Sequence, residues 1–143
     1  MTAEGIAAQG TPCHGRGMKL FTAALFLLAA AIKLAPVVGV LGAGRLRALY
    51  GVDASDPTLA ILLRHRALLF GVVGGLLAAA AFRPELRVAA LVVGLGSALG
   101  FIAVVRLEGG ASGALARVVT ADWVVTAALL VAAGIELASL RGS

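Results

Sequence analysis

Four long runs of apolar residues, separated by polar or glycine-rich segments, constrain this chain more than any other feature. They cover residues 20–42, 59–82, 88–105 and 115–137. A helix needs about 17 to 25 mostly apolar residues to cross the hydrocarbon core of a bilayer, and each run satisfies that length. A chain that crosses a bilayer repeatedly reverses its direction at each crossing. The sequence therefore predicts an all-α, integral membrane protein that folds as an up-down-up-down four-helix bundle.

The composition supports lipid rather than water as the surrounding solvent. Of the 143 residues, 61% are hydrophobic and 13% are charged, and the mean hydropathy is +1.04. Soluble domains carry about 25% charged residues, so this chain has too few polar side chains to cover a water-facing surface. In a soluble protein the net charge of +5 would suggest nucleic-acid binding. Here most of the basic residues lie between apolar runs, where they set topology and contact lipid headgroups, so we expect no nucleic-acid partner.

The domain organisation follows from the same runs. Residues 1–17 are small, polar and interrupted by Gly and Pro, which predicts a disordered N-terminal tail before a transmembrane domain at 18–141. Asp56 precedes Pro57, a pair that predicts a capped helix start.

When Arg64, Arg66 and Arg117 are counted as membrane residues, basic residues are more frequent on the side that holds both termini and the 83–87 turn. When they are counted as loop residues, this excess disappears. By the positive-inside rule, the first count predicts a multi-pass protein of the cell membrane with cytoplasmic termini.

Small residues recur at a spacing that favours close helix packing. Gly71 and Gly75 form a GxxxG pattern in the second run, and Gly96 and Gly100 form another in the third. Such patterns let helix backbones approach closely in lipid, where little hydrophobic force acts between helices. Packing within one chain is the preferred interpretation, and dimerisation is the alternative.

Ionisable residues gather in one half of the predicted bilayer. With a rise of 1.5 Å per residue, Lys33, Arg64 and Asp122 each lie about 7 to 12 Å inside the same edge of the apolar layer. A lone carboxylate in hydrocarbon is costly, so Asp122 is expected to be protonated or paired with one of these cations. Arg64 and Arg66 point about 200° apart around their helix, so one of them, with His65 beside it, is expected to face the bundle. The candidate polar cluster is Lys33, Arg64, His65, Arg66, Arg117, Asp122 and Thr126.

Two interpretations of this cluster remain open. It is either an ion-pair network that fixes the register of the helices, or a binding site whose surplus positive charge attracts an anionic or carbonyl-bearing amphiphile. A phospholipid headgroup, a quinone and a small organic acid all fit the second interpretation, because Arg binds carboxylate and phosphate in a bidentate manner. The sequence leaves open whether Lys33, Arg64, Arg66 or Arg117 pairs with Asp122. Glu136, near the opposite edge, is interpreted as structural: it either reaches the membrane interface or pairs with Lys19 or Arg83.

Three stretches carry a resemblance to a known group of proteins. "LYGVDASDPTLAILLRHRALLFGVVGG", "FRPELR" and "ARVVTADWV" resemble small bacterial four-helix membrane proteins, which are similar to the DoxX-like assembly. The resemblance implies a four-helix bundle and, in some relatives, a small subunit associated with quinone-linked sulfur oxidation. Some relatives carry the label phosphopantetheine adenylyltransferase, whose soluble namesake has an HxGH motif. His14 and His65 lie in no such motif, so the sequence does not support that label.

We therefore predict a small, non-enzymatic membrane protein that binds a lipid, a quinone or a partner subunit through the polar cluster. No catalytic or metal-binding residues are predicted, and quinone is the one candidate cofactor. The expected partners are membrane lipids and either a larger membrane complex or further copies of the chain. A quinone-linked oxidoreductase subunit, with Asp122 and His65 handling protons, is the alternative. An oligomeric anion or acid transporter ranks below it.

Overall fold

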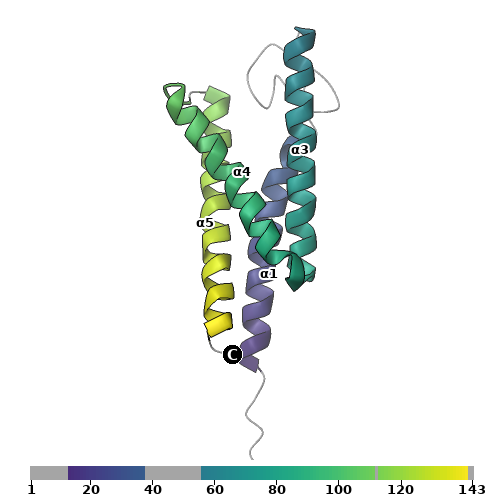
Figure 1. Cartoon of the computed structure of the whole chain (residues 1–143). Helices are drawn as coiled ribbons and strands as arrows, with labels where there is room; N and C mark the ends of the chain where they lie inside the picture. The colour runs from purple at the N-terminus through teal and green to yellow at the C-terminus, as the bar shows by residue number, and fades with distance from the viewer. Residues whose placement is uncertain (1–12, 38–55, 112, 142–143) are drawn as a thin grey trace, which may run out of the picture.

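A computed structural model of the chain describes residues 13–37, 56–111 and 113–141. These residues form four long helices and no strand: α1 (Cys13–Leu34), α3 (Pro57–Phe82), α4 (Arg87–Leu107) and α5 (Gly113–Arg141), with a short 3₁₀ turn, η2 (Pro84–Leu86), before α4. Successive long helices run in opposite directions in Figure 1. All four are long and apolar enough to cross a membrane, which is the make-up of a multi-pass membrane protein.

The start and the end of α3 have local causes. The Asp56 carboxylate accepts hydrogen bonds from the backbone N–H groups of Thr58, at 2.7 Å, and Leu59, at 3.4 Å. It thereby caps the helix as the sequence predicts, and Pro57 occupies the first turn, where a missing N–H costs nothing. The helix ends before Pro84, which cannot continue the α-helical hydrogen-bond pattern. This short turn sends α4 back along α3.

The first helix differs from the predicted span at 20–42 and from the predicted tail at 1–17. α1 already begins at Cys13, and its α-helical part ends at Leu34, followed by a 3₁₀ turn over 35–37. Pro36 explains the end, because proline lacks an N–H and disfavours the α conformation in the residue before it. Residues 1–12 and 38–55 lie outside the described residues, as does the predicted span beyond residue 37. The other three helices contain the spans predicted for them.

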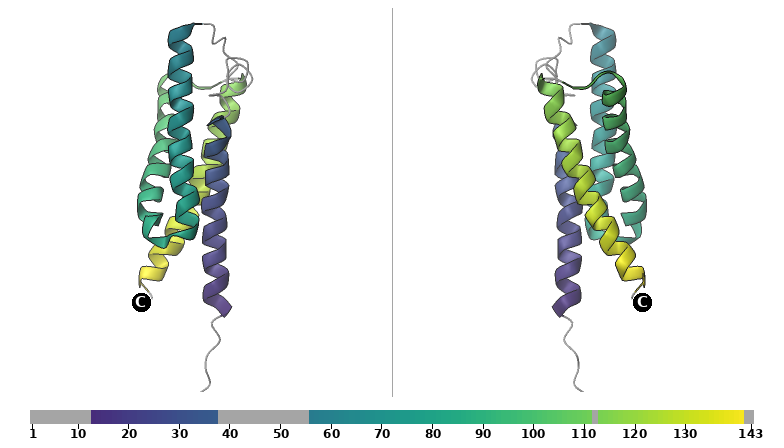
Figure 2. Two further views of the ribbon diagram at one scale, coloured as in Figure 1. Left: turned by 90° about the vertical axis from the view of Figure 1, so that its right-hand side faces the viewer. Right: turned by 90° about the vertical axis from the view of Figure 1, so that its left-hand side faces the viewer.

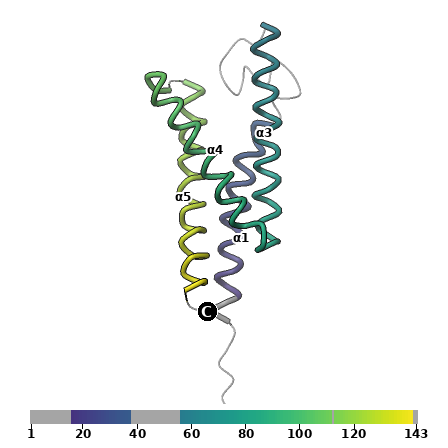
Figure 3. Tube along the Cα trace, in the orientation of Figure 1, coloured from purple at the N-terminus to yellow at the C-terminus, as the bar shows by residue number. Residues whose placement is uncertain are grey.

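Each long helix packs mainly against two others. α1 lies between α3 and α5, and α4 contacts the same two helices from the other side (Figures 1 and 3). The 29 residues of α5 extend about 43 Å, more than the roughly 30 Å of hydrocarbon in a bilayer. Figure 2 shows α5 running obliquely across the other helices, which is how a long helix fits a thinner layer.

The core consists of a few large side chains separated by many alanines. Phe26, Leu77 and Leu129 are fully buried, and alanines from every long helix fill the space between them. Small side chains allow the helix backbones to approach closely, which is the main source of contact energy between helices in lipid. The outer face is apolar as well: Val72, for example, is 70% exposed on α3.

The closest glycine contacts are not those of the predicted GxxxG pairs. A Cβ placed on Gly74 would lie 2.7 Å from Leu34 Cγ, and one on Gly94 would lie 2.7 Å from Leu129 Cδ1. A Cβ on Gly75, Gly96 or Gly100 would meet no atom of the described chain within 4 Å. A Cβ on Gly71 would lie 3.3 Å from Val37 Cγ2, so the expected packing within the chain is confirmed for Gly71 and is wrong, among the described residues, for the other three. GxxxG spacing places two glycines on one face but does not determine which face meets a neighbour.

Candidate functional site

A buried ion pair joins α1 to α5. Lys33 Nζ lies 2.7 Å from Asp122 Oδ1, and the two side chains are only 2% and 5% exposed. The sequence left the partner of Asp122 open among four cations, and the geometry assigns it to Lys33. The ammonium group also lies 4.8 Å from the centre of the Phe70 ring on α3, so the pair contacts three helices. Such a pair is costly to break, because removing one partner leaves the other charge buried without compensation.

One oxygen of this pair is left without a partner. Asp122 Oδ2 is buried and accepts no hydrogen bond from any described residue. Thr126, which the sequence placed on the same face, donates to the backbone carbonyl of Asp122 at 2.8 Å and not to the carboxylate. Buried polar atoms in proteins almost always have a hydrogen-bond partner, so an unpaired carboxylate oxygen calls for an explanation.

The ion pair borders a cavity of about 390 Å³ between α1, α3 and α5, called here the Lys33 cavity. Most of its wall is apolar, and the charged residues in it are Lys33, Arg117 and Asp122. Arg117 is exposed and forms no ion pair with another described residue, so its charge is available to a ligand. The lining residues are Ile32, Lys33, Ala35, Pro36, Phe70, Ala114, Arg117, Val118, Ala121 and Asp122.

The basic residues of α3 do not join this cavity as one cluster. Arg66 is half-buried, and its guanidinium lies 5.0 Å from the Phe70 ring centre and 4.2 Å from that of Phe101 on α4. Arg64 and His65 are exposed. One arginine thus faces inward and the other outward, as their 200° separation predicts, but the expected inward position of His65 is wrong. The surplus positive charge expected beside Asp122 is limited to Arg117.

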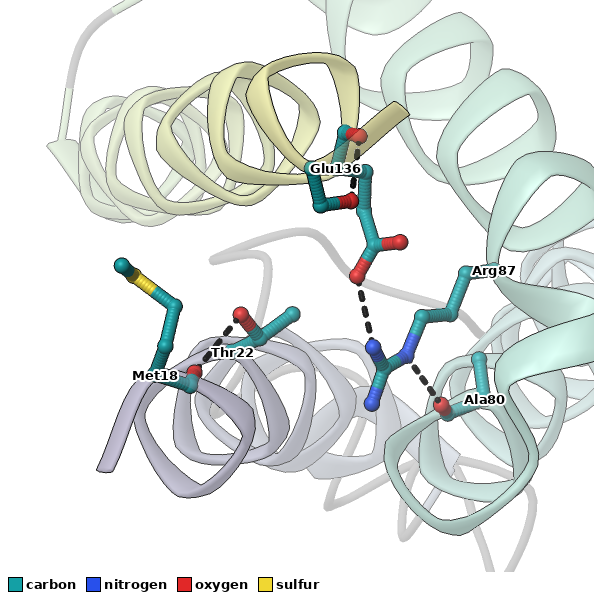
Figure 4. Close-up of polar contacts among 6 residues, drawn as sticks. Met18, Thr22, Ala80, Arg87 and Glu136 are labelled. Atoms are coloured by element: carbon teal, nitrogen blue, oxygen red, sulfur yellow. Dashed lines mark hydrogen bonds and ion pairs between the residues drawn. The ribbon is translucent and has the colours of Figure 1, made fainter. Parts of the chain in front are cut away.

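A second ion pair, which the sequence did not predict, lies near the other end of α5 (Figure 4). Arg87 Nη1 lies 2.6 Å from Glu136 Oε1, and Arg87 Nε donates to the backbone carbonyl of Ala80 at 3.3 Å. The expected partners of Glu136, Lys19 and Arg83, are therefore wrong. Arg87 was assigned to the turn, whereas it begins α4 and is 8% exposed. Counting residues inward from the end of the molecule where α4 begins and α5 ends would have placed Arg87 and Glu136 at similar levels.

The described residues contain no group of three His, Cys, Asp or Glu side chains that could hold a metal ion. A comparison of the chain with models of known protein families, with curated proteins and with solved structures gave no match.

Proposed function

We propose that this chain is a non-enzymatic, multi-pass protein of the cell membrane, folded as an up-down-up-down bundle, that binds an amphiphile in the Lys33 cavity. The observation that carries the proposal is the buried Asp122 Oδ2 without a hydrogen-bond partner beside that cavity. A buried acceptor left unpaired costs about 1 to 3 kcal/mol, which a ligand that donates an O–H or N–H would recover.

The lining narrows the chemistry of the ligand. Asp122 requires a hydrogen-bond donor, whereas the guanidinium of Arg117 attracts an acceptor or a negative charge. Apolar residues form the rest of the wall, which suits a hydrocarbon chain. An amphiphile with a hydroxyl or acid group offers a donor to Asp122, an acceptor to Arg117 and an apolar chain to the wall. Examples are a quinol, a protonated organic acid and a phospholipid with a hydroxylated headgroup. A fully oxidised quinone has no donor for Asp122 and fits less well.

The size of the cavity supports a head group rather than a whole lipid. Small-molecule sites in proteins commonly enclose about 300 to 1,000 Å³, and the Lys33 cavity, at about 390 Å³, lies near the lower limit. The head and the first carbons of an amphiphile would fill it. The remainder of the chain would extend among the surrounding lipids.

Native mass spectrometry of protein extracted gently from its own membrane tests this proposal. Arg117→Gln removes the available charge, and Ala121→Leu fills the cavity without changing charge. Each has a matched control outside the cavity: Arg106→Gln, at an exposed position on α4, and Ala127→Leu, at an exposed position on α5.

We expect the wild type to carry an added non-covalent mass that both cavity variants lose and both controls keep. The mass and fragmentation of the released compound then identify its class. A wild type that appears without any bound compound, or equal retention by Ala121→Leu and Ala127→Leu, would contradict the proposal.

Cytoplasmic termini are favoured by the basic residues at the end of the molecule where α1 begins and α5 ends. The resemblance to DoxX-like proteins, a quinone-linked partner subunit and self-association stay predictions.

A further inference from the structure

A second cavity, the Arg87 cavity, lies near the end of the molecule opposite the Lys33 cavity and has a volume of about 330 Å³. Figure 4 shows its polar centre, where Arg87 reaches from α4 toward Glu136 on α5, with Thr22 of α1 alongside. Lys19 and Ser139 complete the polar part of the wall. Because it shares no lining residue with the Lys33 cavity, it is independent of the proposed function.

The Arg87 cavity still has donors for an anion. Of the guanidinium nitrogens of Arg87, Nε donates to Ala80 and Nη1 to Glu136, which leaves Nη2 without a hydrogen bond to a described residue (Figure 4). Lys19 is exposed and forms no ion pair with a described residue. With Glu136 as the single acid, the charged wall carries a formal charge of +1, which matches one phosphodiester group.

An apolar groove of about 430 Å³, the α5 groove, continues from this cavity. The two share Met18, Ile135 and Ser139, and the groove has no charged residue in its wall. From Ser139 back to Val131, it follows α5 for about 12 Å toward the middle of the molecule. The groove is lined by Met18, Val131, Gly134, Ile135, Ala138 and Ser139.

We propose that these adjoining spaces hold one phospholipid, with its phosphate between Lys19 and Arg87 Nη2 and an acyl chain along the α5 groove. The order of the two parts matches a lipid in a bilayer, because the charged part lies near the helix ends and the apolar part lies deeper. A free phosphate would use the same donors but would leave the α5 groove unfilled.

Two substitutions test the head and the chain separately. Lys19→Gln removes a donor from the Arg87 cavity, and Arg83→Gln removes an exposed positive charge at the same end of the molecule but outside the cavity. Gly134→Leu fills the α5 groove, and Gly100→Leu makes the same change at an exposed glycine of α4. A Cβ at either glycine meets no described atom within 4 Å, so both variants are expected to fold.

Native mass spectrometry of detergent-purified protein, titrated with dioleoylphosphatidylglycerol, gives the readout. Parallel titrations use dioleoylglycerol, which lacks the phosphate, and inorganic phosphate, which lacks the chains. We expect Lys19→Gln to weaken retention of the phospholipid about tenfold, as loss of one hydrogen bond to a charged group implies. Gly134→Leu should reduce retention, and both controls should match the wild type. Dioleoylglycerol should bind more weakly than the phospholipid.

Three outcomes would overturn the proposal. Equal weakening by Lys19→Gln and Arg83→Gln would indicate a diffuse attraction between basic residues and anionic lipid. Equal retention by Gly134→Leu and the wild type would exclude the chain from the α5 groove. Inorganic phosphate that displaces the phospholipid completely at equal concentration would identify a site for a free anion.

Discussion

Lys33 and Asp122 stabilise the contact between α1 and α5 only as long as both are present. Lys33→Met should lower the free energy of unfolding by about 3 to 5 kcal/mol, because Asp122 then remains buried without its cation. The double variant Lys33→Met/Asp122→Leu should recover most of this loss, since an apolar pair of similar volume needs no compensation. Thermal unfolding in detergent, followed by the fluorescence of Trp123, the single tryptophan, measures both.

Arg64→Met is the control for this comparison, because Arg64 is exposed and forms no ion pair with a described residue. We expect its effect to stay within about 0.5 kcal/mol. A double variant no more stable than Lys33→Met would show that the packing at this point, rather than the charge, is what the substitution disturbs.

Arg66 contributes through aromatic rings on two helices. Phe101→Leu removes the ring 4.2 Å from the guanidinium and should destabilise the protein by about 1 to 2 kcal/mol. Phe82→Leu, at a position 76% exposed, makes the same change without this contact and should have little effect. The same thermal unfolding assay compares the two, and equal effects would exclude a specific contribution from the contact between Arg66 and Phe101.

For single residues, the sequence predicted the level along the helix and the opposite directions of Arg64 and Arg66, but not which side chains face inward. Counting helix rise placed Lys33 and Asp122 at one level, and the cost of a buried carboxylate required a cation for Asp122. To identify Lys33 rather than Arg66 as the partner of Asp122, one needs to know how each helix is rotated and which helices are its neighbours. Residue spacing along one helix does not give this information. The outward position of His65 was missed for the same reason.

At the scale of the helices, Gly74 determines how closely α1 and α3 approach. Gly74→Ala would place a Cβ 2.7 Å from Leu34 Cγ and 3.2 Å from its backbone nitrogen, so the helices must move apart. We expect a loss of about 1 to 3 kcal/mol in unfolding free energy. Gly75→Ala, at the next position, meets open space and should be neutral or stabilising by up to about 1 kcal/mol. Equal effects in the unfolding assay would contradict this account.

The helices themselves were largely predictable, and their boundaries were less so. Three predicted spans lie within α3, α4 and α5, because length and apolar content determine a crossing. The first span was extended to residue 42 because the apolar run continues past Pro36, although proline ends the α-helical part at Leu34. An apolar run shows which residues can lie in lipid, but the α-helix within it ends where a residue such as proline breaks the backbone hydrogen-bond pattern.

For the whole molecule, the proposed orientation predicts which side of the membrane Cys13 faces. Cys13, the single cysteine, lies at the start of α1. With cytoplasmic termini, a membrane-impermeant maleimide should label it in inverted vesicles and not in intact spheroplasts. A Glu108→Cys variant in a Cys13→Ser background, at the opposite end of the molecule, should give the reverse pattern. The reverse labelling of Cys13 would contradict the orientation.

The acids of both ion pairs, Asp122 and Glu136, belong to α5, whereas their cations come from α1 and α4. The ribosome completes α1 and α4 before α5, so Lys33 and Arg87 enter the membrane without their counterions. Until α5 is synthesised, Lys33 and Arg87 lack the acids that compensate them in the finished structure. Arrival of α5 neutralises both at once. A chain interrupted before α5 would lack both acids, so that Lys33 and Arg87 would each remain without a counterion.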